Sequence, residues 1–169
     1  MSFVKPSAKD FAEAAERHLD DVHAFLVYLT GDRNVAEDLT AETFARALER
    51  WRRFDPRRGS ASTWLCQLAR STALDHFRSE ERRRRREGRW ALDRPEAGEA
   101  VFGDGLSPEL ERALSRLSAA EREVVALRIV LELDGESAAR VLGISTTACS
   151  TRLSRALQKL EKEVADVAA

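Results

Sequence analysis

Apolar residues in the first half of the chain recur with the period of an α-helix, in three successive stretches. Ser7 and Asp10 can form a capping box before the first stretch, and Gly31 can end it. Asn34 can cap the second, and Ser60 or Ser62 can begin the third. We expect these buried positions: Phe11, Ala15, Leu19, Val22, Phe25, Leu26 and Leu29; Leu39, Phe44, Ala47, Leu48 and Trp51; Leu65, Leu68, Ala69, Thr72, Ala73 and His76. The pattern predicts a three-helix module over residues 1–87.

The same period returns after residue 106 and predicts four short helices over residues 107–169. Ser107 followed by proline, Ser118 followed by Glu121, then Asp134 and Ser145 are the expected N-caps. Their apolar positions include Leu110, Leu114, Leu117, Val124, Leu127, Leu131, Cys149, Leu153, Ala156, Leu160 and Val164. Residues 88–106 hold glycines, a proline and several acids without a clear period, which predicts a flexible acidic linker. The fold class is therefore all-α, with two small helical modules joined by that linker.

Composition excludes several kinds of protein. Hydrophobic residues make up 43% and charged residues 34%, and no apolar stretch approaches the roughly 20 residues that span a bilayer. The N-terminus lacks the apolar segment of a signal peptide, so we expect a cytoplasmic protein without membrane insertion. Cys66 and Cys149 are far apart and the three histidines are scattered, which favours neither a disulfide nor a metal site.

The formal net charge of −1 hides an uneven distribution. Residues 78–90 carry seven arginines against three glutamates, and residues 91–111 carry six acids against one arginine. A basic segment followed by an acidic one is compatible with a nucleic-acid-binding surface in a protein of neutral total charge. The basic run is expected to add salt-sensitive attraction to phosphates.

The second module contains residues with the spacing of a helix-turn-helix. Ala139 allows two helices to cross closely, and Gly143 supplies a left-handed turn. Ile144 fills the angle between the helices, and Ser145 caps the second of them. Such a helix presents its first turns to the major groove. Its outward positions are short, polar or basic: Thr146, Thr147, Ser150, Thr151, Arg152, Ser154 and Arg155.

Three stretches of the chain resemble extracytoplasmic-function (ECF) sigma factors, in the order found in that family. Residues Tyr28–Leu48 resemble region 2, as do Arg58–Arg70 and Ala73–Arg78. Residues Leu117–Val124 through Arg152–Ala156 resemble region 4. The resemblance implies that residues 1–87 dock on the β′ clamp helices of core RNA polymerase and open the −10 promoter element. It implies that residues 107–169 read the −35 element as a duplex and touch the β flap.

The resemblance also implies an anti-sigma factor as a partner, no cofactor and no catalytic residue. Carboxylates on the second predicted helix, with apolar neighbours, would meet core polymerase: Glu37, Asp38, Leu39, Glu42 and Phe44. A loop of small and basic residues with the helix after it would hold the −10 element: Arg58, Ser60, Ser62, Thr63, Trp64, Arg70 and Arg78. Trp64 fits core packing and DNA contact equally well. The −35 contacts would be Thr146, Thr147, Ser150, Thr151, Arg152 and Arg155.

Two other functions remain open on the residues alone. A helix-turn-helix regulator that binds DNA without polymerase explains the second module, but it leaves the acidic helix face and the arginine-rich helix unexplained. An anti-sigma or adaptor protein predicts no sequence-specific DNA contact, which the polar and basic recognition helix disfavours. An enzyme would need a catalytic constellation, a phosphate-binding loop or metal-ligand spacing, and the sequence contains none of these.

Overall fold

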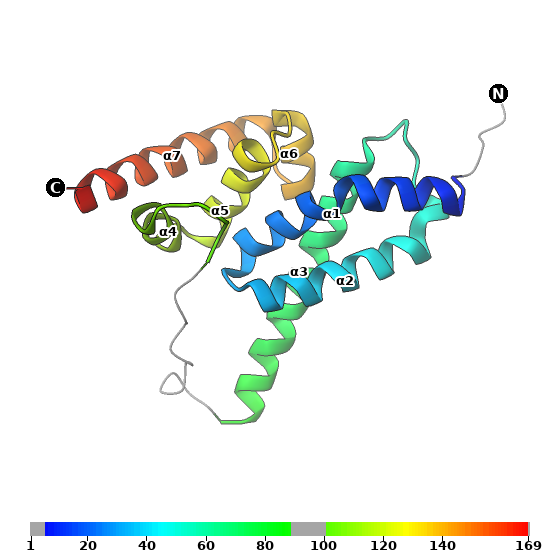
Figure 1. The fold of residues 1–169 in the computed structure, drawn as a ribbon, viewed down its shortest axis with the longest axis horizontal. Helices are drawn as coiled ribbons and strands as arrows, with labels where there is room; N and C mark the ends of the chain where they lie inside the picture. The colour runs from blue at the N-terminus through cyan, green and yellow to red at the C-terminus, as the bar shows by residue number, and fades with distance from the viewer. Residues whose placement is uncertain (1–5, 89–100, 169) are drawn as a thin grey trace.

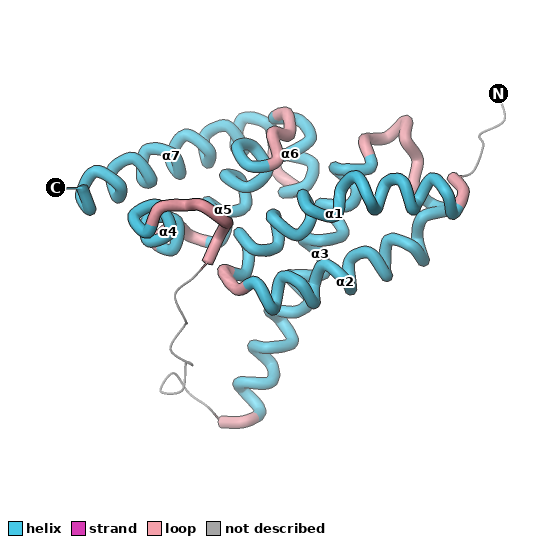
Figure 2. Tube along the Cα trace, viewed as in Figure 1, coloured by secondary structure: helices cyan, strands magenta, loops and turns pink. Residues whose placement is uncertain are grey.

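The computed structural model describes residues 6–88 and 101–168, and these form two helical bundles packed side by side (Figure 1). Figure 2 shows that helices joined by short loops make up both bundles. None of the helices in the described ranges has both the length and the apolar character that crossing a bilayer requires. The all-α, two-module architecture predicted from the sequence is confirmed.

The first bundle consists of α1 (Ala8–Thr30), α2 (Arg33–Arg50) and α3 (Ala61–Arg86), with a short 3₁₀ turn, η1 (Trp51–Arg53), after α2. The predicted capping box at the start of α1 is present, and Gly31 ends that helix with a left-handed φ of 64°. Ser60 caps α3, whereas Asp32 and not Asn34 caps α2. Asp32 is the cap because its carboxylate accepts hydrogen bonds from two free backbone N–H groups of the first turn, those of Asn34 and Val35.

Aromatic rings fill the end of this bundle where α2 meets α3. Trp51 is buried, stacks on Phe54 at 4.9 Å between ring centroids, and lies 5.4 Å from Phe11 and 5.7 Å from Trp64. Its indole N–H donates to the carbonyl oxygen of Ser7 at 2.9 Å, so its polar group is satisfied. The cluster fixes the loop between α2 and α3 against the first turn of α1.

Two leucines of the predicted stripes are not buried. Leu48 is 56% exposed on α2, because the neighbouring Ala47 takes the inward position and successive helical residues point about 100° apart. Leu19 is 47% exposed, because the fully buried positions of α1 begin at Val22. The burial predicted for these two side chains is wrong.

The second bundle consists of α4 (Pro108–Ser115), α5 (Ala119–Val125), α6 (Gly135–Leu142) and α7 (Thr146–Ala168), with a π-helical turn, η2 (Ala126–Val130), after α5. All four predicted N-caps are present, at Ser107, Ser118, Asp134 and Ser145. The prediction that all the helices here are short is wrong for α7, which has 23 residues. Its apolar face packs along α4, α5 and α6, which supports a longer helix than its own residues would.

Residues 101–106 were predicted as the end of the linker, and the structure gives them fixed contacts with both bundles. Phe102 is 3% exposed and lies 5.8 Å from the ring of Tyr28 on α1. Its backbone N–H donates to the carboxylate of Glu111 on α4. Burying the Phe102 ring against Tyr28 stabilises this part of the segment, although acidic residues surround it in the sequence. The predicted flexibility therefore does not extend to residues 101–106. Residues 89–100 of the predicted linker lie outside the described residues.

Candidate nucleic-acid interface

The corner between α6 and α7 has the geometry of a helix-turn-helix. Gly143 adopts a left-handed φ of 65° and ends α6, and the Ile144 N–H donates to the Ala139 carbonyl oxygen at 3.1 Å. The Ser145 hydroxyl accepts from the Ala148 N–H at 3.1 Å and caps α7. Ala139 is buried where the two helices cross. Each residue has the local role that its type predicted.

The candidate −35 residues lie together on the first turns of α7. Five are exposed and Arg152 is half-buried, and together with Ser118 and Glu121 of α5 most of them border a shallow hollow of about 560 Å³. Arg155 is exposed and forms no hydrogen bond or ion pair within residues 6–88 and 101–168. The surface thus presents hydroxyls and a free guanidinium, which are groups that bond to base edges and phosphates.

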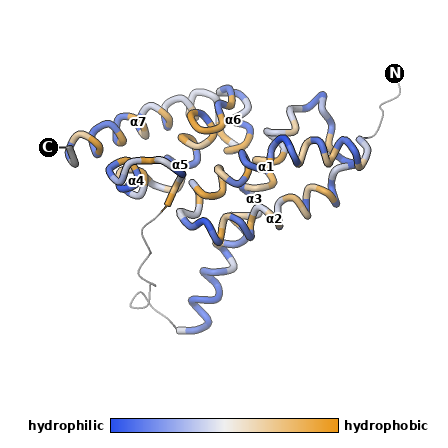
Figure 3. Tube along the Cα trace, viewed as in Figure 1, coloured by the Kyte–Doolittle hydropathy of each residue, from blue (hydrophilic) through white to orange (hydrophobic). Residues whose placement is uncertain are grey.

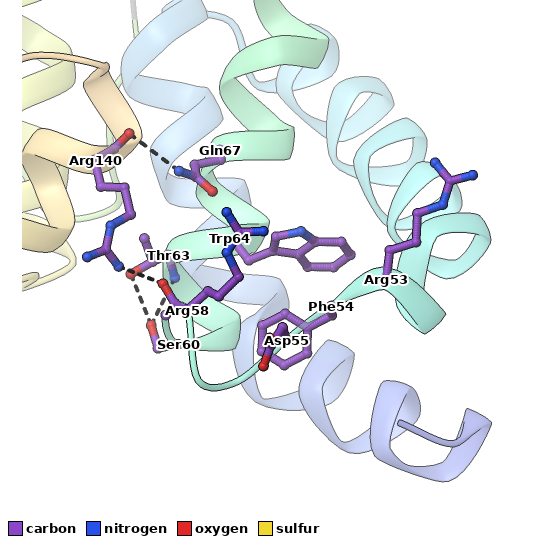
Figure 4. Close-up of a pocket in the computed structure, with 10 residues that line it drawn as sticks. Arg53, Phe54, Asp55, Arg58, Ser60, Thr63, Trp64, Gln67 and Arg140 are labelled. Carbon is purple, nitrogen blue, oxygen red and sulfur yellow. Dashed lines mark hydrogen bonds between the residues drawn. The ribbon is translucent and has the colours of Figure 1, made fainter. Parts of the chain in front are cut away.

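Four of the candidate −10 residues line a cleft at the N-terminal end of α3 (Figure 4): Arg58, Ser60, Thr63 and Trp64. The cleft has a volume of about 570 Å³ and is lined by Arg53, Phe54, Asp55, Arg58, Gly59, Ser60, Thr63, Trp64, Gln67 and Arg140. It combines aromatic rings, guanidinium groups and a backbone turn, the components with which proteins hold unstacked bases. A cleft of this composition suits a single nucleotide strand better than a rigid duplex.

Two of the predicted −10 residues are fixed by local hydrogen bonds. Ser60 caps α3 by accepting from the Thr63 N–H at 3.1 Å, and its hydroxyl donates to Thr63 Oγ1 at 3.0 Å. Thr63 is 2% exposed, so its side chain shapes the loop from inside and does not offer a contact surface. Arg58 is exposed at the rim, and Ser62 is half-buried on the first turn of α3.

Trp64 packs in the aromatic cluster and also lines the cleft. One part of the ring packs against Trp51 and Phe54 in the aromatic cluster, with centroids 5.7 and 5.4 Å apart. The ring also lines the cleft, and Figure 4 shows it between the loop and α3. The same side chain therefore supports the bundle and forms one wall of the candidate site.

Arg70 and Arg78 lie farther along α3, on a second hollow of about 250 Å³ that also includes Gln67 and Val141. Arg78 is exposed and lies 3.7 Å from the Asp75 carboxylate. Arg70 instead pairs with Glu123 of α5, at 3.3 Å between Nε and Oε2. Burial raises the pKa of Glu123 above its ordinary value, and the charge of Arg70 opposes that shift. The final turns of α3 are strongly hydrophilic (Figure 3) and extend away from both bundles, as the arginine run there predicts.

The candidate docking residues lie on α2. Glu37 and Asp38 are exposed, and Glu42 is exposed with its carboxylate paired to Arg46. Leu39 is 3% exposed and packs in the core, and Phe44 is half-buried against it. The carboxylates can therefore meet a partner directly, whereas Leu39 can act only by supporting the helix.

Several cleft residues were not predicted from the sequence, among them Arg53, Phe54, Asp55, Gln67 and Arg140. The sequence around Phe54 signals a chain break, and a break gives no indication that the ring returns to Trp51 and Trp64. Arg140 belongs to the other bundle, and no local pattern predicts contact across 82 sequence positions. Glu123 is another such residue, because its sequence context resembles that of an ordinary surface glutamate.

Comparisons with known proteins agree with this division into two sites. The family description Sigma-70 region 2 matches residues 14–83, and Sigma-70, region 4 matches residues 107–160. The chain is 32% identical over 163 residues to the ECF RNA polymerase sigma factor BldN of Streptomyces coelicolor, covering 94% of this chain and 62% of that protein. It is 30% identical over 152 residues to the ECF RNA polymerase sigma factor SigX of Bacillus subtilis, covering 85% and 78%.

The fold is also that of a known structure. A complex of the sigma factor RpoE with the anti-sigma factor NepR from Bartonella quintana contains a chain that superposes with a TM-score of 0.79, at 24% identity. The match covers 93% of this chain and 98% of that chain. The fold and the matches to regions 2 and 4 define a two-module, helix-turn-helix protein of the sigma-70 class. Within that class, the chain belongs to the family of ECF RNA polymerase sigma factors.

Proposed function

We propose that this chain is an alternative sigma factor that binds core RNA polymerase and directs it to promoters with particular −35 and −10 elements. The observation that carries the proposal is the presence of two chemically different DNA-facing sites on two separate modules. An exposed recognition helix suits duplex DNA, and a cleft of rings and arginines suits an unpaired strand. Family membership supports the same role.

The division of labour follows from these sites. Residues 1–87 dock on the polymerase through the carboxylates of α2 and hold the −10 strand in the α3 cleft. Residues 107–169 read the −35 duplex with the first turns of α7 and touch the β flap. RNA synthesis is the chemistry of the polymerase, so the chain acts as an initiation factor in the cytoplasm. An anti-sigma factor is the partner that would hold it inactive, as the solved RpoE complex with NepR suggests by analogy.

A helix-turn-helix regulator that works without polymerase is the second candidate. It requires only α4 to α7 and leaves the α2 carboxylates and the α3 cleft without a role. Core polymerase separates the two functions, because a sigma factor forms a stoichiometric complex with it and a simple regulator does not.

Reversing the charge of Asp38 tests the docking face. Asp38 is exposed on α2, so Asp38→Lys leaves the core of the bundle intact while replacing an attractive charge with a repulsive one. We expect the affinity for core polymerase to fall about tenfold or more, since like charges across an interface cost several kcal/mol. The measurement is a titration of labelled chain with purified core polymerase by fluorescence anisotropy.

The matched control is Glu13→Lys, which makes the same charge change at an exposed position of α1. Circular dichroism and thermal unfolding establish that both variants are folded. Equal affinities for Asp38→Lys and Glu13→Lys would remove the α2 carboxylates from the docking face.

A further inference from the structure

The two modules contact each other at the candidate −10 cleft in this structure. Arg140 of α6 donates from Nη1 to the carbonyl oxygen of Arg58, 3.0 Å away, and Gln67 of α3 donates to the carbonyl oxygen of Arg140 at 3.4 Å. Figure 4 shows both bonds closing one side of the cleft. The helix-turn-helix module thus covers part of the site expected to hold the −10 strand.

This arrangement does not allow both promoter elements to be bound at once. Elements centred at −35 and −10 are about 25 base pairs apart, or about 85 Å along B-form DNA. Arg140 touches the −10 loop, and six residues later Thr146 begins the recognition helix, a path of at most about 20 Å. The modules must therefore separate before the chain can occupy a whole promoter.

The contact between the modules also neutralises positive charge that would otherwise attract DNA. Glu123 is buried between the bundles, pairs with Arg70 of the candidate −10 site, and feels the positive charge of Arg152 of the candidate −35 site. One carboxylate thereby neutralises arginines of both sites, in the way a DNA phosphate would. Burying the Glu123 carboxylate has a desolvation cost that offsets part of its attraction to the arginines. A polyanion such as DNA can therefore displace Glu123 from them.

Residues 101–104 hold the modules together at the other end of the interface. The buried Phe102 ring lies between Tyr28 of α1 and the guanidinium of Arg122, whose Cζ is 5.6 Å from the ring centroid. The Val101 N–H donates to the Gly31 carbonyl oxygen at 3.2 Å, and Asp104 pairs with Arg33. We call residues 101–104 the clasp, because they contact both modules from a segment that lies outside the helices of either.

We propose that the free chain is self-masked: the clasp centred on Phe102 holds the helix-turn-helix module over the −10 cleft, and this contact must open before promoter DNA can bind there. The recognition helix stays exposed in the closed arrangement, so masking applies to the −10 site and spares the −35 site. The proposal rests on the function proposed above for the two sites.

Phe102→Ala is the variant that tests the clasp, with Val101→Ala as its matched control. Phe102 is buried between the modules, whereas Val101 is its exposed neighbour in the same segment. Truncating a buried phenylalanine removes its packing between the modules, so we expect the ratio of open to closed chain to rise at least about tenfold in Phe102→Ala. Val101→Ala keeps the backbone N–H that donates to Gly31 and removes only part of an exposed side chain, so it leaves that ratio unchanged.

Spin labels report the opening directly in the full chain. Cysteines introduced at the exposed positions Glu49 on α2 and Gln158 on α7 carry the labels, since the native Cys66 and Cys149 are buried. Double electron–electron resonance should give one narrow distance distribution for the wild type and for Val101→Ala, and an added second population at other distances for Phe102→Ala. A broad wild-type distribution, or an unchanged one in Phe102→Ala, overturns the clasp.

Binding to two DNA probes then tests the masking. The probes are a fluorescein-labelled single strand and a labelled duplex carrying the −10 and −35 sequences of a promoter that the polymerase complex transcribes. Phe102→Ala should bind the single strand at least about tenfold more tightly than the wild type, because apparent affinity scales with the binding-competent fraction. Duplex affinity should be equal in all three chains. Opening without tighter single-strand binding overturns the masking, whereas loss of polymerase-dependent transcription would instead overturn the proposed function.

Discussion

The two candidate DNA sites of this protein differ in how far they are exposed. The −35 surface on α7 is exposed, and its Arg155 has no partner in the described parts of the chain. The −10 cleft on α3 is lined partly by Arg140 of the other module, and Arg70, farther along α3, pairs with Glu123. A recognition helix needs only a correct corner and short outward side chains, whereas a strand-holding cleft needs rings, arginines and an open approach. The first site is complete within one module, and the second depends on where the modules lie.

Loss of Trp51 should have the largest effect and should separate the two sites most clearly. Trp51→Ala removes the buried ring that joins Phe11, Phe54 and Trp64, which costs about 3–5 kcal/mol of unfolding free energy. Urea denaturation followed by circular dichroism should show an early transition for residues 6–88. Duplex binding by α7 should persist at urea concentrations beyond that transition, at which residues 6–88 are unfolded. A loss below about 1 kcal/mol, which is typical of a surface substitution, would contradict the structural role of the cluster.

Arg155→Ala should have the next largest effect, confined to the −35 site. An arginine that reaches a base edge contributes about 1–3 kcal/mol, so we expect duplex affinity to fall about tenfold or more. Lys162→Ala is the control, because Lys162 is exposed on the same helix but several turns beyond the groove-facing end. Fluorescence anisotropy with the −35 duplex measures both. Equal losses in the two variants would mean that Arg155 only adds positive charge.

Gly143→Ala should have the smallest effect and tests the corner that aims α7. A Cβ at Gly143 meets no atom within 4 Å, so the cost comes from the left-handed φ alone and is about 1 kcal/mol. Gly135→Ala is the matched control, because its Cβ also enters open space but its φ is not positive. Thermal unfolding should show a loss for Gly143→Ala and none for Gly135→Ala. An equal response would show that the corner does not depend on this backbone conformation.

Local patterns predicted the elements and the exposed site better than the covered one. N-caps, the capping boxes at Ser7 and Ser118, and Gly143 are set by interactions within a few residues, so the sequence reveals them. The recognition helix was predictable for the same reason. Tertiary packing decided the rest: Leu48 faces outward although its residue type suggests burial, and Phe102 packs between modules although acidic residues surround it. The partnership of Arg70 with Glu123 joins positions 53 residues apart, and no periodicity encodes it.

The candidate docking face on α2 was predictable in part: local patterns indicate its polar residues, and tertiary packing decides its apolar ones. Its exposed carboxylates Glu37 and Asp38 were predicted from helical spacing, because alternate faces of an amphipathic helix are distinguishable in sequence. Leu39 takes the core position that its helical spacing predicted, whereas Leu48, which was also predicted to be buried, is the large apolar side chain exposed on α2. A pattern identifies which face is polar more reliably than which apolar residue is left uncovered.

Run-off transcription from a genomic promoter library tests the central claim most directly. Purified core RNA polymerase is used with and without this chain, and the start sites of all transcripts are mapped. The account predicts new transcripts that appear only when the chain is added and that share sequences at −35 and −10. The absence of such transcripts, with the chain still binding duplex DNA by itself, would contradict the sigma-factor function and favour a helix-turn-helix regulator.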